Sequence, residues 1–280
     1  MSTRISTRNL LIACVLVMGG ATAAQAGVGG SAARIQNAVA SGSQDAILAE
    51  VERAEYLMCP ACVPIVTDLL DDSRPAVREV AAWWFARRPS VAQSFIDRSL
   101  TDLTGSDSVH ARNGAELLGV FRNIKYIAPL AAASARTALS ADARAAAVTS
   151  LGRIGSQGAN AAIAQAMSDG DPTVRVAALH AWTRVLYQQG AAPAVALVTD
   201  GDASVRAAAA ATVGEEREAT GRAALETVLA SDASAVVRRN AAWALGRIGD
   251  AASRPALEAA VNDPSPLVGA TAKAALSYLH

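Results

Sequence analysis

The residues best suited to do chemistry are two cysteines, Cys59 and Cys62, in a C-x-x-C pattern. Such a pair at the N-terminus of a helix lowers a thiol pKa and supports thiol–disulfide exchange. The βαβ pattern of thioredoxin-like proteins is missing around it, and haem attachment would need His where Val63 stands. We therefore expect a structural disulfide at the turn before a helix that begins near Cys62. A redox-active pair is the alternative.

The rest of the chain has neither the ligand spacing of a metal site nor a recognised catalytic motif. Tetrahedral zinc needs four ligands, and the histidines that could join the two cysteines are scattered at His110, His180 and His280. The chain has no G-x-S-x-G, phosphate-binding loop, G-x-G-x-x-G or H-E-x-x-H motif. We expect a protein that is not an enzyme and that carries no metal and no cofactor.

The first 26 residues have the pattern of a secretory signal peptide. Arg4 and Arg8 form a positive region, residues 10–18 form a short apolar core, and residues 24–26 (Ala-Gln-Ala) form a small-x-small cleavage site. A lipoprotein box ending at Cys14 is the alternative. No later stretch is apolar and long enough to span a bilayer. We expect an exported bacterial protein of the periplasm or cell surface, without stable membrane insertion, whose even cysteine pair suits an oxidising compartment.

Composition excludes a nucleic-acid partner and favours helices. The chain has 25 basic and 25 acidic residues, and removal of Arg4 and Arg8 with the signal leaves a net charge of −2. Nucleic-acid binding requires a concentrated positive face. Alanine accounts for 67 of 280 residues and aromatic residues for only 4%, which is typical of closely packed helices and unlike a sheet.

A repeated pattern organises most of the chain. We expect residues 27–42 to form a flexible lead-in with a short helix, and residues 43–280 to form a repeat array. The clearest copy is Val237–Gly249, and a period of about 31 residues with two helices per unit predicts a solenoid. The recognised copies of the second helix start at Pro75, Arg112, Ala145, Pro172, Ala203, Val237 and Pro264. The predicted fold is all-α, an α-solenoid of about seven two-helix units.

The pattern D-P-x-V-R-x-x-A-A-x-A-L-G-x-I-G resembles the short HEAT-like repeat of the phycobilin lyase type. Its best matches are residues 171–175 and 241–249, and the resemblance covers roughly residues 43–279. Carboxylates before each second helix can cap its free N–H groups. The resemblance further implies that Arg and Asp side chains form a hydrogen-bonded ladder between repeats. The residues expected in this ladder are Asp171, Arg175, Asp202, Arg206, Asp232 and Arg238.

One position of the second helix varies where core positions do not. Six residues after the Val of each unit, or its equivalent, the chain has Trp83, Glu116, Thr149, His180, Ala211, Trp243 and Ala274. A variable position is freed from packing, and on the second helix it is expected to line the concave groove. Trp and Arg dominate interface hot spots. The candidate partner-binding residues are Trp83, Glu79, Glu116, His180, Arg239 and Trp243. The alternative is that the Trp rings cover neighbouring helices.

The adjacent Trp83-Trp84-Phe85 cannot all face one core, because three consecutive positions span most of a helix circumference. We expect at least one of them to be exposed or to contact the N-terminal helices. The following Arg87 and Arg88 are expected to form a solvated helix end, where the helix dipole favours cations, rather than an anion site.

The function expected from these observations is a non-enzymatic protein-binding scaffold or adaptor of the bacterial cell envelope, which binds another protein through its concave face. Two alternatives remain open. One is a periplasmic thiol–disulfide protein that uses Cys59 and Cys62. The other is a lyase- or chaperone-like helper for a client that carries a cofactor.

Overall fold

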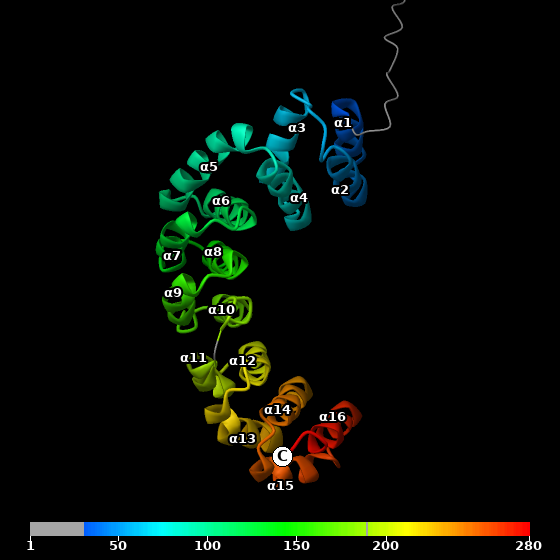
Figure 1. The fold of residues 1–280 in the computed structure, drawn as a ribbon, viewed down its shortest axis with the longest axis vertical. Coiled ribbons are helices and arrows are strands. Elements are labelled where there is room, and N and C mark those ends of the chain that lie inside the picture. The colour runs from blue at the N-terminus through cyan, green and yellow to red at the C-terminus, as the bar shows by residue number, and fades with distance from the viewer. Residues whose placement is uncertain (1–30, 189) are drawn as a thin grey trace, which may run out of the picture.

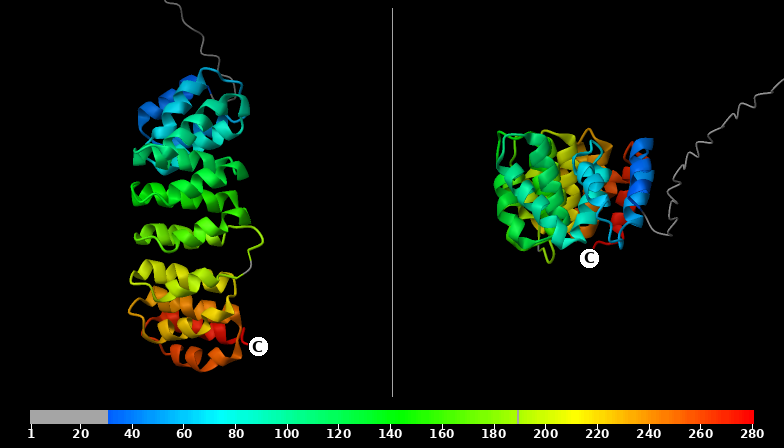
Figure 2. Two further views of the ribbon diagram at one scale, coloured as in Figure 1. Left: turned by 90° about the vertical axis from the view of Figure 1, so that its left-hand side faces the viewer. Right: turned by 90° about the horizontal axis from the view of Figure 1, so that it is seen from above.

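The computed structural model describes residues 31–188 and 190–280, so the predicted signal peptide, residues 1–26, lies outside the described residues. Helices stack side by side into an arc (Figure 1), and the side view shows them as successive layers (Figure 2). The predicted all-α solenoid is confirmed. No helix of the described part of the chain is long and apolar enough to cross a membrane.

The inner side of the arc is formed by the second helix of each repeat (Figure 1). Each of these helices packs against the next one along the arc. Their bounds are α4 (Pro75–Ala86), α6 (Ser108–Val120), α8 (Ala141–Ile154), α10 (Pro172–Trp182), α12 (Ala203–Glu215), α14 (Ala235–Ile248) and α16 (Pro266–Leu276).

The first helix of each repeat lies away from the concave side. These helices are α3 (Cys62–Asp68), α5 (Pro89–Thr104), α7 (Ile127–Ser134), α9 (Asn160–Ala166), α11 (Ala192–Val195), α13 (Arg222–Ser231) and α15 (Arg254–Ala260). Short 3-10 turns adjoin several of them: η1 (Leu69–Asp71), η2 (Ile124–Tyr126), η3 (Gln157–Ala159), η4 (Ala196–Thr199), η5 (Ala219–Gly221) and η6 (Ala251–Ser253). The space between the two layers of helices is filled by buried aliphatic side chains, among them a series of fully buried Leu and Ile residues.

An additional helical pair, α1 (Ala32–Ser41) and α2 (Gln44–Arg53), covers the N-terminal end of the array. Helix α2 packs on α4, and α1 packs on α2 and α3. Ile35 and Ile47 are fully buried in this contact. The helix predicted in the lead-in therefore belongs to the packed array, where it acts as the capping unit that a solenoid needs at its end.

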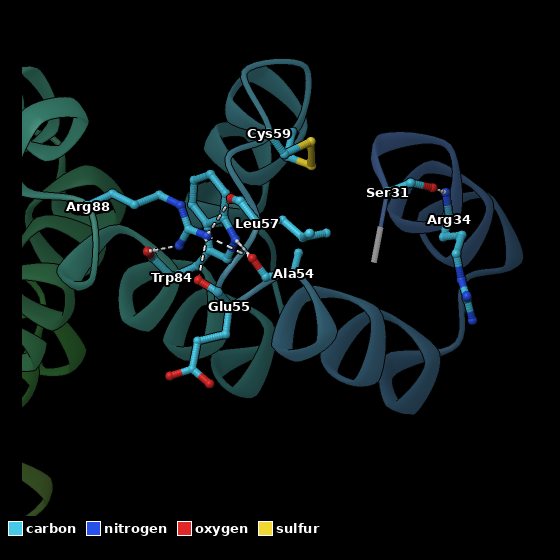
Figure 3. The surroundings of a disulfide bond; sticks show 9 residues. Ser31, Arg34, Ala54, Glu55, Leu57, Cys59, Trp84 and Arg88 are labelled. Atoms are coloured by element: carbon cyan, nitrogen blue, oxygen red, sulfur yellow. Dashed lines mark hydrogen bonds between the residues drawn. A yellow bond between two sulfur atoms is a disulfide. The ribbon is translucent and has the colours of Figure 1, made fainter. Parts of the chain in front are cut away.

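The amphipathic pattern that starts at Gln44 continues to Leu57 in the sequence, but helix α2 ends at Arg53. The physical reason is Arg88, whose guanidinium binds the carbonyl groups that follow the helix (Figure 3). Its Nη2 donates to the carbonyl oxygen of Ala54 at 2.7 Å and to that of Glu55 at 2.7 Å. A helix that continued through these residues would use the same carbonyls in its own hydrogen bonds.

The predicted ladder between repeats exists, with Asp232 and the three expected arginines in it but with other carboxylates in place of Asp171 and Asp202. Arg206 pairs with Asp232 through two hydrogen bonds, of 2.6 and 3.1 Å, and Arg238 pairs likewise with Asp263, at 2.8 and 2.9 Å. Arg175, in contrast, donates to Asp200 at 2.9 Å. Arg144 and Asp169 form a further rung, at 2.8 and 2.9 Å.

Asp171 and Asp202 are therefore corrected from ladder residues to N-caps. Asp171 accepts the backbone N–H of Thr173, and Asp202 accepts those of Ser204 and Val205. The carboxylates that reach the arginines stand two residues earlier, at Asp169 and Asp200. Asp169 and Asp171 both precede α10, and Asp200 and Asp202 both precede α12. Only the earlier aspartate of each pair lies next to the arginine of the previous repeat.

The rungs are joined through the backbone into one continuous ladder. Nη1 of Arg206 donates to the carbonyl oxygen of Asp200, whose carboxylate accepts from Arg175. Nη1 of Arg238 donates in the same way to Asp232. The arginines hold the pKa of Asp169, Asp232 and Asp263 below the usual range of a carboxyl, because each hydrogen bond favours the charged form.

Candidate functional site: the concave face

The variable positions of the second helices are all accessible to solvent on the inner layer of the arc. Of the seven, Trp83, Glu116, Thr149 and Ala211 are partly exposed and His180, Trp243 and Ala274 are exposed, so none is buried. The curvature of this face is visible in one ion pair: Glu79 of α4 contacts Arg153 of α8 at 3.0 Å, across the intervening α6. On the inside of the arc, the curvature thus brings side chains of α4 and α8, two repeats apart, into contact.

Trp83 lines a groove of about 570 Å³ between α2, α4, α6 and α8. The guanidinium of Arg87 stacks over its ring, 4.1 Å from the centroid, and also pairs with Glu55. Glu79 lies on the wall of the same groove. Trp83 is thus accessible from the concave side while one face of its ring is covered by Arg87.

Trp243 lines a second groove, of about 480 Å³, between the ends of α12, α14 and α16. Trp243 is 39% exposed, and the guanidinium carbon of Arg247 lies 5.8 Å from the centroid of its ring. A Cβ placed at Gly214 would lie 2.8 Å from Cζ3 of Trp243, so the ring rests on that glycine. One edge of the ring therefore packs on α12 and the rest faces the groove, and the role of Trp243 in partner binding stays a prediction.

The remaining candidate residues divide between structure and surface. Glu116 accepts two hydrogen bonds from the buried Arg78, at 2.6 and 2.9 Å, which makes it a rung between α4 and α6, and its predicted role in partner binding stays a prediction. His180 is exposed on α10. Arg239 is exposed one turn before Trp243, and its Nη2 donates to Asn240 at 3.3 Å.

The two tryptophans lie near opposite ends of the arc, on α4 and α14, and do not form one cluster (Figure 1). The concave face therefore carries two separate aromatic grooves joined by the surface of α6, α8, α10 and α12. Within the described residues, the two grooves are separate accessible surfaces and do not merge into one deep pocket of the kind that is typical of small-molecule sites.

Cys59 and Cys62 form a disulfide at the start of α3, with Cα atoms 5.2 Å apart (Figure 3). The Cys62 side chain is fully buried and Cys59 is partly exposed. The bond closes the turn between α2 and α3. In this state neither sulfur is a free thiolate, the species that acts as a nucleophile or binds metal. Within residues 31–188 and 190–280, no group of three or more His, Cys, Asp or Glu residues is arranged to hold a metal ion.

Arg88 is a clamp and not the solvated helix end that its sequence position predicts. Its guanidinium stacks 3.6 Å from the ring centroid of Trp84 and donates to the carbonyl oxygens of Ala54, Glu55, Leu57 and Trp84 (Figure 3). Burial lowers the pKa of this guanidinium from its usual value. Trp84 itself is fully buried and donates Nε1 to Ala54, which is the predicted contact with the N-terminal helices.

A row of arginines along the concave face was missed from the sequence. At the C-terminal end of each inner helix from α4 to α14, one arginine stands four residues after the variable position or just beyond the helix. We call this row the arginine edge; it consists of Arg87, Arg122, Arg153, Arg184, Arg217 and Arg247. The sequence carries a signal for this row, because an arginine recurs four or six residues after the variable position in six successive units.

Comparison with known proteins identifies the family. The model of HEAT repeats matches residues 127–211 and 191–277, together more than half of the chain. The chain is a HEAT-repeat protein. No curated protein sequence matches it. The predicted resemblance is confirmed at the level of the family, and the matched residues cover the part of the array that contains the Arg–Asp ladder from Arg144 onward.

Solved structures share the architecture of this HEAT-repeat protein. The YibA protein of Escherichia coli has a TM-score of 0.57 at 15% identity, over 87% of this chain and 91% of that one. Kap121p has a TM-score of 0.54 at 13% identity, over 88% of this chain but only 33% of its own length. The complex of CpcE and CpcF of phycocyanin lyase from Nostoc is 22% identical over 78% of this chain and 94% of that one, with a TM-score of 0.39. At these identities the similarity shows the fold alone.

Proposed function

We propose that this HEAT-repeat protein is a non-enzymatic scaffold or adaptor that binds another protein through its concave face. HEAT repeats generally mediate protein binding. The observation that carries the proposal is the pair of aromatic grooves, in which Trp83 and Trp243 remain accessible although both could have been covered by neighbouring helices. A rigid, preformed surface of stacked helices avoids much of the ordering cost of association.

The cellular location belongs to the same proposal. The signal-peptide pattern of residues 1–26 and the Cys59–Cys62 disulfide both suit export to an oxidising compartment. We therefore place the scaffold in the bacterial cell envelope, in the periplasm or at the cell surface.

Replacement of both ring systems should abolish partner capture without unfolding the array. We expect the Trp83→Ala/Trp243→Ala double variant to recover at least about tenfold less partner from an envelope extract, because buried Trp anchors contribute about 2 kcal/mol or more to an interface. The measurement is affinity capture with the mature chain as bait, quantified by mass spectrometry, with the thermal midpoint recorded in parallel.

The matched control is Tyr56→Ala, which removes an aromatic side chain that is 89% exposed and lies outside both grooves. This control should capture as much as the parent protein. If the Trp double variant captured equally well, or if its loss were accompanied by a large fall of the thermal midpoint, the tryptophans would be packing residues and the concave-face proposal would fail.

A further inference from the structure

The arginine edge differs from the arginines of the ladder, because most of its members have no acidic partner. Arg87 pairs with Glu55 and Arg153 with Glu79. Among the described residues, the other four have no carboxylate oxygen within the 4.0 Å of an ion pair. These four are the exposed residues Arg122, Arg184, Arg217 and Arg247.

The two ends of the inner helices are therefore electrically unlike. At their N-terminal ends, arginines such as Arg206 and Arg238 are neutralised by the aspartates of the ladder. At their C-terminal ends the cations remain open to solvent. The helix dipole favours a cation there, but it does not require an arginine at the same end of each inner helix from α4 to α14.

Surface grooves concentrate this charge. A groove of about 520 Å³ between the ends of α6, α8 and α10 is lined by Arg122, Arg153 and Arg184 and by no carboxylate. It shares Arg122 and Arg153 with the groove of Trp83, whose walls also carry Glu52 and Glu79. The groove of Trp243 is lined by Arg217 and Arg247 and by no Asp or Glu side chain. The positive surface thus runs beside both aromatic grooves.

Two members of the row occupy backbone positions that favour glycine. Arg122 has φ 50° and Arg217 has φ 51°, in the left-handed region just after their helices. At the same place in two other repeats the chain has glycine, at Gly155 with φ 72° and Gly249 with φ 78°. In those repeats the arginine stands two residues earlier, at Arg153 and Arg247. Each of these repeats therefore presents one arginine at this corner, even where the backbone would prefer glycine.

We propose that the arginine edge binds an extended acidic polypeptide segment of the partner protein, with carboxylates at about every third residue. The proposal rests on the proposed function and specifies the chemistry of the partner. Packed helices lie about 8–10 Å apart, and an extended chain advances about 3.3–3.6 Å per residue, so three residues of such a segment match one repeat. Carboxylates form charge-assisted, often bidentate, hydrogen bonds with guanidinium groups.

Spacing and overall charge favour this occupant over a nucleic acid. Duplex DNA carries a negative charge every 1.7 Å or so, which one arginine per repeat would neutralise only sparsely. The chain as a whole has equal numbers of acidic and basic residues, so the rest of its surface would repel a polyanion as often as attract it. A short acidic segment needs only the arginine edge itself.

The test measures binding of a fluorescein-labelled peptide of repeated Glu-Ser-Thr, about 18 residues long, by anisotropy on the full mature chain. We expect binding that weakens as salt rises from about 0.05 to 0.3 M, and an affinity at least about tenfold lower for Arg122→Gln/Arg184→Gln. The control Arg98→Gln/Arg254→Gln removes the same charge from α5 and α15, outside the concave layer, and should change affinity less than about twofold.

Each competing outcome has a distinct signature. A peptide of equal composition with its glutamates clustered at one end should bind more weakly, and equal binding would overturn the spacing argument. Equal loss in both double variants would show that only net charge matters, and tighter binding of single-stranded oligothymidylate than of the peptide would point to nucleic acid. Either result overturns the inference. If Trp-dependent capture of a protein persists while the peptide fails to bind, this inference is wrong and the scaffold function stands.

Discussion

The Arg206→Met variant is expected to lose about 3 kcal/mol of unfolding free energy at pH 7, because it leaves the Asp232 carboxylate buried without its partner. The Asp232 side chain is 5% exposed and that of Arg206 17%. Arg206 also donates to the carbonyl oxygen of Asp200, so its removal breaks the ladder in two directions. Met retains much of the aliphatic packing of the arginine stem. Urea denaturation followed by circular dichroism measures the loss.

The pH dependence of that loss distinguishes a charge effect from a packing effect. The hydrogen bond from Arg206 holds the pKa of Asp232 below its ordinary value in the folded protein. The stabilisation from this pair is therefore fully present above about pH 4, the ordinary pKa of Asp, and is lost as pH falls through the lowered value. We expect the difference between parent and variant to narrow in acid.

The control for this variant is Arg254→Met, which removes an exposed arginine of α15 that makes no side-chain ion pair among the described residues. Its stability should stay within about 0.5 kcal/mol of the parent. A difference between parent and Arg206→Met that stayed constant from neutral pH to about pH 3 would assign the effect to packing and contradict the role given to the pair.

The Gly152→Ala variant is expected to be less stable than the parent by about 2 kcal/mol, although Ala is the better helix former by about 1 kcal/mol. A Cβ at Gly152 would lie 2.7 Å from Cα and 2.8 Å from Cβ of Ala181 on the next inner helix. Because the first of these is a backbone atom, α8 and α10 must move apart. Contacts between neighbouring repeats hold a solenoid together, so the transition should broaden or split as the two parts of the array uncouple.

Gly201→Ala provides the matched control, because a Cβ at Gly201 would meet nothing within 4 Å. Chemical denaturation should leave the midpoint of Gly201→Ala unchanged and lower that of Gly152→Ala. An increase of the Gly152→Ala midpoint, as in an isolated helix, would mean that the helices do not approach as closely as the structure shows.

Local signals predicted most of the fold. The recognised starts at Pro75, Pro172 and Ala203 are the first residues of α4, α10 and α12. Capping by Asp171 and Asp202, and the helix that starts at Cys62, likewise depend on residues within a few positions of each other. The site was less predictable. The stripe of variable residues is accessible as expected, but the carboxylate of Glu116 forms an ion pair with Arg78 within the array. The partner-binding role of all the candidates stays a prediction.

Long-range contacts explain what the sequence pattern missed. Nothing local indicates that Arg88 turns back over Trp84 to carbonyls more than thirty residues earlier. The choice between Asp169 and Asp171 as the partner of Arg144 is also decided in space, because both precede the same helix and only the stacking of repeats brings one of them within hydrogen-bond distance.

The sequence by itself determined the repeat, the inner helices and their caps, since these depend on helical periodicity and on interactions within one turn. Only the tertiary structure decided which arginines are neutralised and which remain free. Ladder arginines such as Arg206 meet a carboxylate of the next repeat, whereas Arg184 at the other end of an inner helix meets none in the described chain. That difference arises because stacking places the N-terminal ends of α8, α10, α12 and α14 against an acidic turn of the next repeat, whereas no such turn among the described residues meets the C-terminal end of α10, where Arg184 lies.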